Sequence, residues 1–214
     1  MADFDIPQAL KLTWVYELPV GRGKKFLNQG GAVDKIFGGW KITAVQNYLS
    51  GSPLVFSSYI PAAISTGPYG RGHWATRPDM IGDWSGVKGS VGGPLDPGGT
   101  PYLNVPLEPD AQGCKGPFCP VPTTADGYAL HPGNAPRVFG NIRGPGKMFE
   151  DFGIIKGTRI NERINLEFMT NFFNVFNRHG FGNPDPVVDS PTFGRILNPA
   201  QGPRTIQFVL RLNF

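Results

Sequence analysis

Residues 205–214, TIQFVLRLNF, alternate between apolar and polar side chains up to the last residue of the chain. The apolar positions are Ile206, Phe208, Leu210, Leu212 and Phe214, and the positions between them are Gln207, Val209, Arg211 and Asn213. A period of two places these two sets on opposite faces of a β-strand. Because the last residues of most domains fray, a pattern that continues unbroken to a terminal aromatic residue predicts a strand with a defined place in a sheet.

Segments 9–18, 40–50 and 163–173 show the same period, and strand signals also occur around Phe152 and Ile154, so we predict strands over 9–18, 40–50, 149–158 and 163–173. The segment 40–50 is less regular than the others because Gln46 falls on its apolar face. Gly (30) and Pro (22) make up about a quarter of the 214 residues, a composition that argues against a helical protein and favours strands joined by long loops.

The connections between these strands differ greatly in length. Residues 61–135 show no strand pattern, and 174–203 form a second long connection, whereas 20–38 is a medium polar connection and the turn near residue 160 is short. We therefore predict barrel strands and a turn over 1–60, a Gly/Pro-rich loop over 61–148 and barrel strands over 149–214, within one incomplete barrel domain.

Alternation alone fits a soluble β-sandwich as well as an outer-membrane barrel. The clean strands have the length of about 9–11 residues that crosses a bilayer at a tilt, and Trp40, Tyr48, Phe172 and Phe214 lie near strand ends, where barrels carry aromatic girdles. If the carboxyl terminus lies at the periplasmic rim, strand parity puts both long connections outside the cell and both shorter ones in the periplasm, as is the rule for these barrels. The predicted fold class is all-β: an antiparallel transmembrane β-barrel segment with long Gly/Pro-rich external loops.

Five strands cannot close a barrel, and an unpaired strand edge is not tolerated in lipid. The start of the chain shows no signal peptide, and no apolar window is long enough for a transmembrane helix. We therefore expect a piece of a larger barrel, or a chain that needs partner chains, in the bacterial outer membrane.

Several other function classes find no support in the sequence. The net charge of +4 comes without a long basic run, which argues against nucleic acid as a partner. The stretch GRGKK lacks the earlier glycine of a phosphate-binding loop. The histidines and loop carboxylates lack the spacing of metal sites, and no serine stands in a nucleophile elbow. The histidines are His73, His131 and His179, and the carboxylates are Asp79, Asp83, Asp96, Asp110 and Asp126. We predict no enzyme, no cofactor and no metal.

Three groups of side chains have two interpretations each. Polar-face charges either line the barrel lumen or guide a ligand; they are Lys11, Arg163, Glu167 and Arg211. The loop aromatics either contact a ligand or another chain, or form local clusters; they are Tyr59, Tyr69, Trp74, Trp84, Tyr102 and Phe118. Cys114 and Cys119 lie either side of a Gly-Pro turn, which favours a disulfide and an oxidising compartment over two free thiols.

The stretches FDIPQALKLTWVYELPVGRGKKF, GGWKITAVQNYLSGSPL, RINLEFMTNFFNVFNRHGFGNP and SPTFGRI resemble the C-terminal barrel of TonB-dependent outer-membrane receptors, in particular the acidobacterial kind with an N-terminal carboxypeptidase-regulatory-like domain. The ending QFVLRLNF is similar to the signal read by the barrel-assembly machinery, with Phe208, Leu210, Leu212 and Phe214 as its residues. The resemblance implies ligand uptake driven by a periplasmic energy coupler and gated by a plug domain. It also implies outer-membrane lipid, the remainder of the barrel and the assembly machinery as partners. The alternative is an extracellular β-rich structural protein that self-assembles by strand pairing.

Overall fold

The computed structural model describes residues 3–59, 77–91, 99–125 and 129–214, and the chain divides into two compact units. The loop unit comprises Met1–Pro7, Ser50–Gly146 and Phe181–Ala200, and the sheet unit comprises Gln8–Leu49, Lys147–Gly180 and Gln201–Phe214. The predicted boundaries near residues 60 and 148 differ from this division, because the segment after Leu49 leaves the long strands and joins the loop unit. Each unit is described by itself below.

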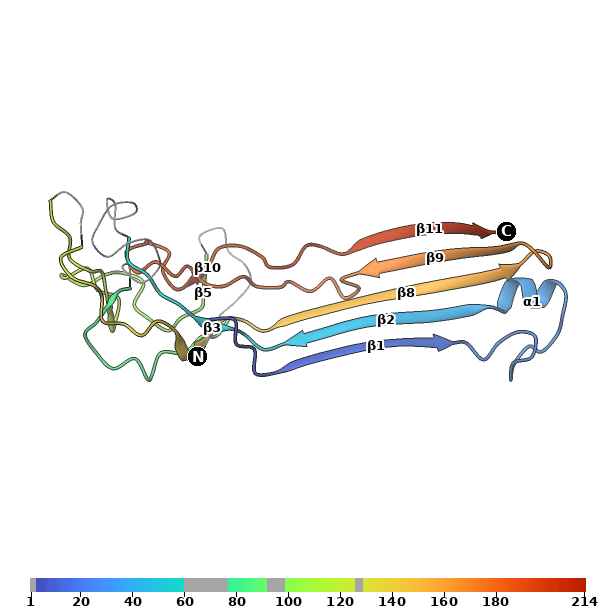
Figure 1. Ribbon diagram of the computed structural model, residues 1–214, viewed down its shortest axis with the longest axis horizontal. Coiled ribbons are helices and arrows are strands. Elements are labelled where there is room, and N and C mark those ends of the chain that lie inside the picture. Colours follow the sequence, from blue (N-terminus) through green and yellow to red (C-terminus); the bar gives the residue numbers. More distant parts are fainter. Residues whose placement is uncertain (1–2, 60–76, 92–98, 126–128) are drawn as a thin grey trace. The chain divides into compact units, whose positions relative to one another are not determined.

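The sheet unit contains five long antiparallel strands in the order β1-β2-β8-β9-β11 (Figure 1). Their bounds are Ala9–Glu17 for β1, Trp40–Leu49 for β2, Lys147–Arg159 for β8, Asn165–Phe173 for β9 and Thr205–Asn213 for β11. All five predicted strands are present, and no strand end differs from its predicted position by more than two residues. Each strand pairs with the next one across the sheet, so the predicted antiparallel fold class is confirmed.

The register of these strands sorts side chains by parity across the whole sheet. Trp14 of β1 lies opposite Ala44 of β2, Ala44 lies opposite Phe152 of β8, and Phe152 lies opposite Phe172 of β9. Directly opposite residues point to the same face, so even-numbered residues of all five strands share one face and odd-numbered residues share the other. The predicted apolar set of each strand is thus brought onto a single surface, which we call the even face.

The connection between β1 and β2 contains a short helix, α1 (Ala32–Phe37), which the prediction of a plain polar connection over 20–38 did not include. Six residues are too few to show a helical period in the sequence. The Asp34 side chain accepts a hydrogen bond from the backbone N–H of Arg22, and its carbonyl accepts one from Gly38. These bonds fasten the loop before α1 to the end of the helix. No helix in the described part of the chain is long and apolar enough to span a bilayer.

Among its described residues, the loop unit holds three two-stranded sheets. Pro53–Leu54 (β3) pairs with Phe139–Arg143 (β7), Asp79–Met80 (β4) with Phe118–Cys119 (β6), and Thr100–Pro101 (β5) with Arg195–Ile196 (β10). The expectation of unpatterned loops over 61–135 and 174–203 was wrong at β4, β5, β6 and β10. Ladders of two residues are too short to show alternation, so the sequence carried no signal for them.

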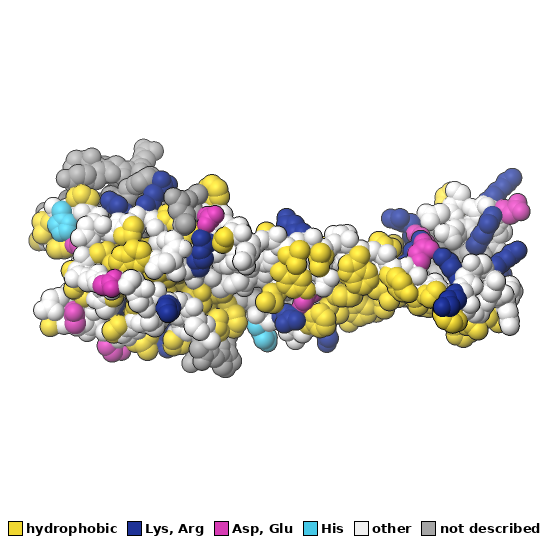
Figure 2. All heavy atoms as spheres, turned by 90° about the horizontal axis from the view of Figure 1, so that it is seen from below, with side chains coloured by type: hydrophobic (Ala, Val, Ile, Leu, Met, Phe, Trp, Pro, Cys, Tyr) yellow, Lys and Arg dark blue, Asp and Glu magenta, His cyan; other side chains and the backbone are white. Residues whose placement is uncertain are grey.

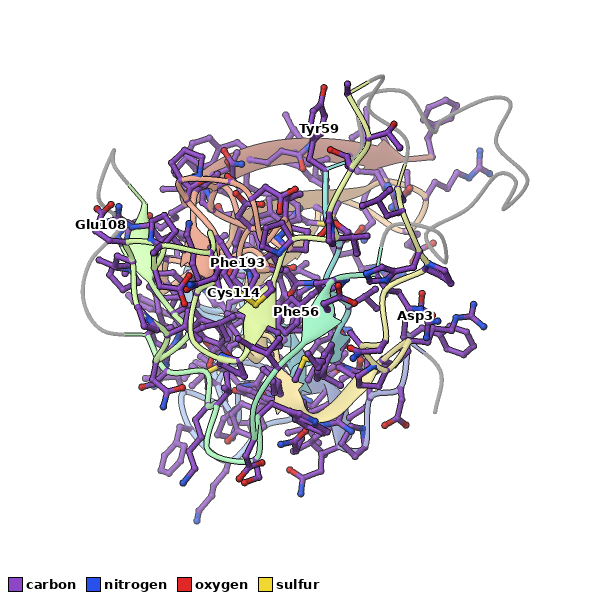
Figure 3. All side chains as sticks on the ribbon, turned by 90° about the vertical axis from the view of Figure 1, so that its left-hand side faces the viewer. Asp3, Phe56, Tyr59, Glu108, Cys114 and Phe193 are labelled. Atoms are coloured by element: carbon purple, nitrogen blue, oxygen red, sulfur yellow. A yellow bond between two sulfur atoms is a disulfide. The ribbon has the colours of Figure 1, made fainter. Side chains whose placement is uncertain are left out.

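An aromatic core stabilises the loop unit (Figure 3). Phe56, Phe118, Phe139 and Phe193 are at most 1% exposed, and their ring centroids lie 4.8–5.7 Å apart in mostly edge-to-face geometry. Trp84 packs edge-on to Phe139 at 5.1 Å. Because aromatic side chains bury large areas and such pairs add further stabilisation, this cluster explains how segments so rich in Gly and Pro form a compact unit.

Candidate functional site: the even face of the sheet

The even face exposes a continuous set of large apolar side chains. Phe208 and Leu210 are 67% and 68% exposed. Other large apolar strand residues of this face that are at least a third exposed are Leu10, Leu12, Trp14, Tyr16, Met148, Ile154, Phe168, Ile206 and Leu212. The buried hydrophobic cluster consists wholly of loop-unit residues, and no described layer of the sheet unit covers this face. Exposed apolar areas of this extent mark a protein or membrane contact.

A row of aromatic side chains crosses the even face over a small residue. Ala44 is 1% exposed because Trp14 and Phe152, its partners on either side, meet above it with ring centroids 5.9 Å apart. Phe176, which follows β9, continues the contact with Phe152 at 6.1 Å. A larger side chain than alanine would separate the rings, so the row depends on this pattern of large and small residues.

One polar network interrupts the even face. Glu150 is buried, and its carboxylate accepts hydrogen bonds from the Tyr48 hydroxyl at 2.9 Å and from Arg178 Nε at 2.7 Å. Gln46 donates to the Tyr48 oxygen and accepts from the Trp14 indole N–H. A charge on an apolar surface requires such partners. The sequence placed Gln46 on the apolar face, which indicated one polar position there. Glu150 and Arg178 were not among the predicted site residues.

The opposite, odd-numbered face carries most of the charged strand residues, together with a few exposed apolar ones such as Val15 and Val45. Two of the predicted lumen charges face each other, because Arg211 lies opposite Glu167 in the β9–β11 register, whereas Lys11 lies opposite Asn47. Arg163 lies in the turn between β8 and β9. Near α1, Glu17 forms ion pairs of 2.9 Å with both Lys24 and Lys41. Apolar residues on one face and charges on the other are the arrangement of a barrel wall between lipid and an aqueous lumen.

The residues predicted as an assembly signal lie together on the last strand. Phe208, Leu210 and Leu212 are on the exposed even face of β11, and Phe214, which follows β11, is 96% exposed. In the loop unit, Cys114 and Cys119 are joined in a disulfide, next to Phe118 of the aromatic core. The assembly-signal residues thus lie on an exposed surface, and the two cysteines lie together in a buried position.

The remaining candidates are scattered. Trp84, Tyr102 and Phe118 belong to the loop-unit core, as in the local-cluster interpretation, while Tyr59 is exposed. Tyr69, Trp74, His73, Asp96 and Asp126 lie outside the described residues. His131 Nε2 lies 3.4 Å from the Asp79 carboxylate. Within the described ranges, no group of three His, Cys, Asp or Glu side chains is placed as metal ligands would be.

A hollow of about 410 Å³ lies in the loop unit. Its lining consists of Asp3, Ser52, Pro53, Leu54, Val55, Phe56, Asn183, Pro184 and Pro186. Its volume falls within the range of small-molecule sites, and its wall combines a mostly apolar surface with the Asp3 carboxylate and the Asn183 amide. Asp3 and Phe56, two of its lining residues, are labelled in Figure 3.

The two outer strands of the sheet are open. Among the described residues, β1 pairs only with β2, and β11 pairs only with β9. Each outer strand thus presents backbone N–H and C=O groups that a neighbouring strand would satisfy. An open sheet with one apolar face is suited to be one section of a larger cylindrical wall.

The model of one protein family, described as an outer membrane beta barrel domain, matches residues 1–207. No curated protein and no solved structure matches the chain. The match agrees with the exposed even face, the polar opposite face and the open strand edges, and it favours the membrane over the self-assembling extracellular alternative. The chain therefore belongs to the outer membrane beta barrel domain family, and its location is the bacterial outer membrane.

Proposed function

We propose that the chain forms part of the barrel wall of a TonB-dependent-receptor-type protein that takes up a ligand across the outer membrane. In this proposal the end of the sheet that carries α1 faces the periplasm and the loop unit lies outside the cell. Lipid contacts the even face, the remainder of the barrel pairs with β1 and β11, and the barrel-assembly machinery reads β11. The proposal contains no enzymatic step.

The observation that carries the proposal is the asymmetry of the connections. The chain leaves the sheet between β2 and β8, and again between β9 and β11, at the same end, because Leu49 lies opposite Lys147 and Phe173 opposite Thr205. Both excursions supply residues to the loop unit and its core. Long structured loops on the external side are where barrels of this class contact their ligands, and the hollow beside Asp3 offers a site of suitable size.

The orientation is tested by inserting an epitope at Gln112, which is exposed in the loop unit, or at Glu162, in the turn between β8 and β9. We expect antibody to label intact cells only for the Gln112 insertion, and to label both after the outer membrane is permeabilised. Labelling of the Glu162 insertion in intact cells would show that the turn between β8 and β9 is outside the cell, and it would contradict the proposed external position of the loop unit.

Receptor-type uptake is tested by the DNA upstream of the Met1 codon and by the energy coupler. We expect one open reading frame that encodes further strands and a plug domain, and we expect cells that lack the coupler to lose ligand accumulation while the barrel stays in the membrane. A frame that closes shortly before Met1 would leave an outer-membrane barrel segment without this transport role.

A further inference from the structure

The connection between β1 and β2 presents large apolar side chains to its surroundings. The exposed fractions are 53% for Phe26, 47% for Leu27, 59% for Ile36 and 51% for Phe37. A periplasmic turn that is bathed in water gains nothing from four such side chains, and clustered exposed apolar residues indicate a contact surface.

This connection is held in a defined conformation. The N–H of Phe26 donates to the Pro19 carbonyl at 3.0 Å, and the N–H of Gly21 donates to the Phe26 carbonyl at 2.9 Å. A Cβ at Gly21 would lie 2.6 Å from the Cα of Gly38, so the loop and the end of α1 are in close contact. Leu27 has a backbone φ of 50°, a value that residues other than glycine rarely adopt. The exposure of Phe26 and Leu27 is thus set by a specific local fold.

Helix α1 has one apolar and one polar side. At 100° per residue, Val33, Ile36 and Phe37 share one side, and Asp34 and Lys35 share the other. Asp34 and Lys35 line a polar hollow together with Lys41, an odd-face residue. The Trp40 indole N–H, from the even face, donates to the Ile36 carbonyl at 3.2 Å. This bond joins the end of α1 to a side chain at the edge of the even face.

Basic side chains border the apolar residues. Lys25 Nζ lies 5.4 Å from the centroid of the Phe26 ring, and Lys156 Nζ lies 5.8 Å from that of Trp40 and donates to the Gly38 carbonyl. Figure 2 shows Lys and Arg side chains gathered beside hydrophobic ones at the end of the sheet that carries α1. Amines and indole rings bordering apolar groups are typical of the headgroup region of a membrane.

We propose that residues 19–39 form a membrane-interface element that binds the phospholipid leaflet on the periplasmic side. Phe26, Leu27, Ile36 and Phe37 insert among the acyl chains, and Lys25 and Lys156 lie at the level of the lipid phosphates. The choice of leaflet rests on the orientation proposed above. Phospholipid is the occupant because the patch is joined to the edge of the lipid-facing even face and because its amines complement phosphate charge.

The test uses the complete barrel in vesicles of phosphatidylcholine with or without phosphatidylglycerol. A fluorophore is attached at position 37 in Phe37→Cys, at position 35 in Lys35→Cys, or at position 210 in Leu210→Cys, with the native disulfide kept oxidised. Lipids brominated in the upper acyl chain and aqueous iodide serve as quenchers. Position 35 is the matched control because it lies on the polar side of the same helix.

We expect brominated lipid to quench the label at position 37 at least twofold more than the label at position 35, with iodide showing the reverse order. Phosphatidylglycerol should increase lipid quenching at position 37, and Lys25→Gln should reduce that increase. Equal iodide quenching at positions 37 and 35, or no response of position 37 to either quencher, would overturn the inference. If brominated lipid quenches neither position 37 nor position 210, the proposal that the even face contacts lipid is refuted as well. If it quenches position 210 but not position 37, only the interface element is refuted.

Discussion

At the scale of single residues, Phe56 is one of the central side chains of the loop-unit core. It is 1% exposed and contacts three other phenylalanine rings at 4.8–5.4 Å. Phe56→Ala should destabilise the loop unit by about 3–5 kcal/mol because it removes buried area and leaves a cavity. Hydrogen exchange of the Val188 amide, which donates to the Ser57 carbonyl, measures this loss.

The matched control for Phe56→Ala is Tyr59→Ala in the same segment. Tyr59 is 65% exposed. It donates a hydrogen bond to Asp189 from its backbone N–H, so the side chain is not involved in that bond. Its substitution should change the free energy of opening by less than about 0.5 kcal/mol. Similar effects of the two substitutions would show that the aromatic cluster does not stabilise the unit.

A second residue-scale prediction concerns pH. Partial desolvation of its carboxylate raises the pKa of Asp189 above its usual value although the residue as a whole is exposed, and the N–H of Tyr59 and the charge of Lys115 offset this only in part. A raised carboxyl pKa in the folded state means that stability is fully present below the unfolded pKa and is lost as pH rises through the folded pKa. Asp189→Asn keeps an oxygen acceptor for the Tyr59 N–H and removes the titration.

The expected outcome for Asp189→Asn is a stability difference that grows with pH. Below about pH 3.8 the variant and the parent should have similar loop-unit stability, and above the folded pKa the variant should be the more stable of the two. Exchange of the Val188 amide at a series of pH values, corrected for intrinsic rates, provides the comparison. A difference that stays constant with pH, or favours the parent as pH rises, would contradict the assigned cause.

At the scale of elements, the two faces of β11 should respond differently to the same added charge. Leu210 lies on the exposed even face, and Gln207 lies on the odd face opposite Asn171. Leu210→Arg should cost the barrel about 2–4 kcal/mol if position 210 is near the bilayer midplane, and Gln207→Arg should cost less than about 1 kcal/mol. Denaturant unfolding of the complete barrel in bilayers measures both, and equal costs would contradict a lipid-facing even face.

How much of each element the sequence predicts depends on its length. β1, β2, β9 and β11 were predictable because nine or more residues show the period of two, and β8 was predicted from the apolar residues around Phe152 and Ile154. β3, β4, β5, β6 and β10 were not, since two paired residues contain no period. α1 was not predicted either, because six residues are too few to show a helical period.

The candidate site was predictable only in part. Strand parity placed the apolar strand residues on the even face and Lys11, Glu167 and Arg211 on the odd face, because register follows from pairing between neighbouring strands. Arg163, predicted with these charges, lies in the turn between β8 and β9. Parity also placed Gln46 on the apolar face. The network around Glu150 was not predictable, because its partner Arg178 comes from a loop and lies 28 residues away in the chain. Side-chain contacts of that kind depend on tertiary structure, which no local pattern records.

At the scale of the whole molecule, the two units differ in what stabilises them. The loop unit has its own aromatic core and a disulfide, whereas the sheet unit is a single layer whose buried residues are few and small or polar, such as Ala44, Glu150 and Asn174. A sheet with no packed layer on either face is not stable in water. We therefore expect the sheet unit to depend on lipid and on further strands, and the loop unit to be stable without them.

This difference predicts how the units respond when amphiphile is removed. In detergent or bilayers, amides of both units should be protected from hydrogen exchange. After transfer to plain buffer, the Phe172 and Leu210 amides of the sheet unit should exchange rapidly, whereas the Ala135 and Val188 amides, which donate to Pro78 and Ser57 in the loop unit, should keep most of their protection. Loss of protection in both units would mean that the loop unit is not stably folded when the sheet unit is unfolded. Retention in both would mean that a protein layer, rather than lipid, covers the even face, which is the result that the exposed Phe208 and Leu210 side chains argue against.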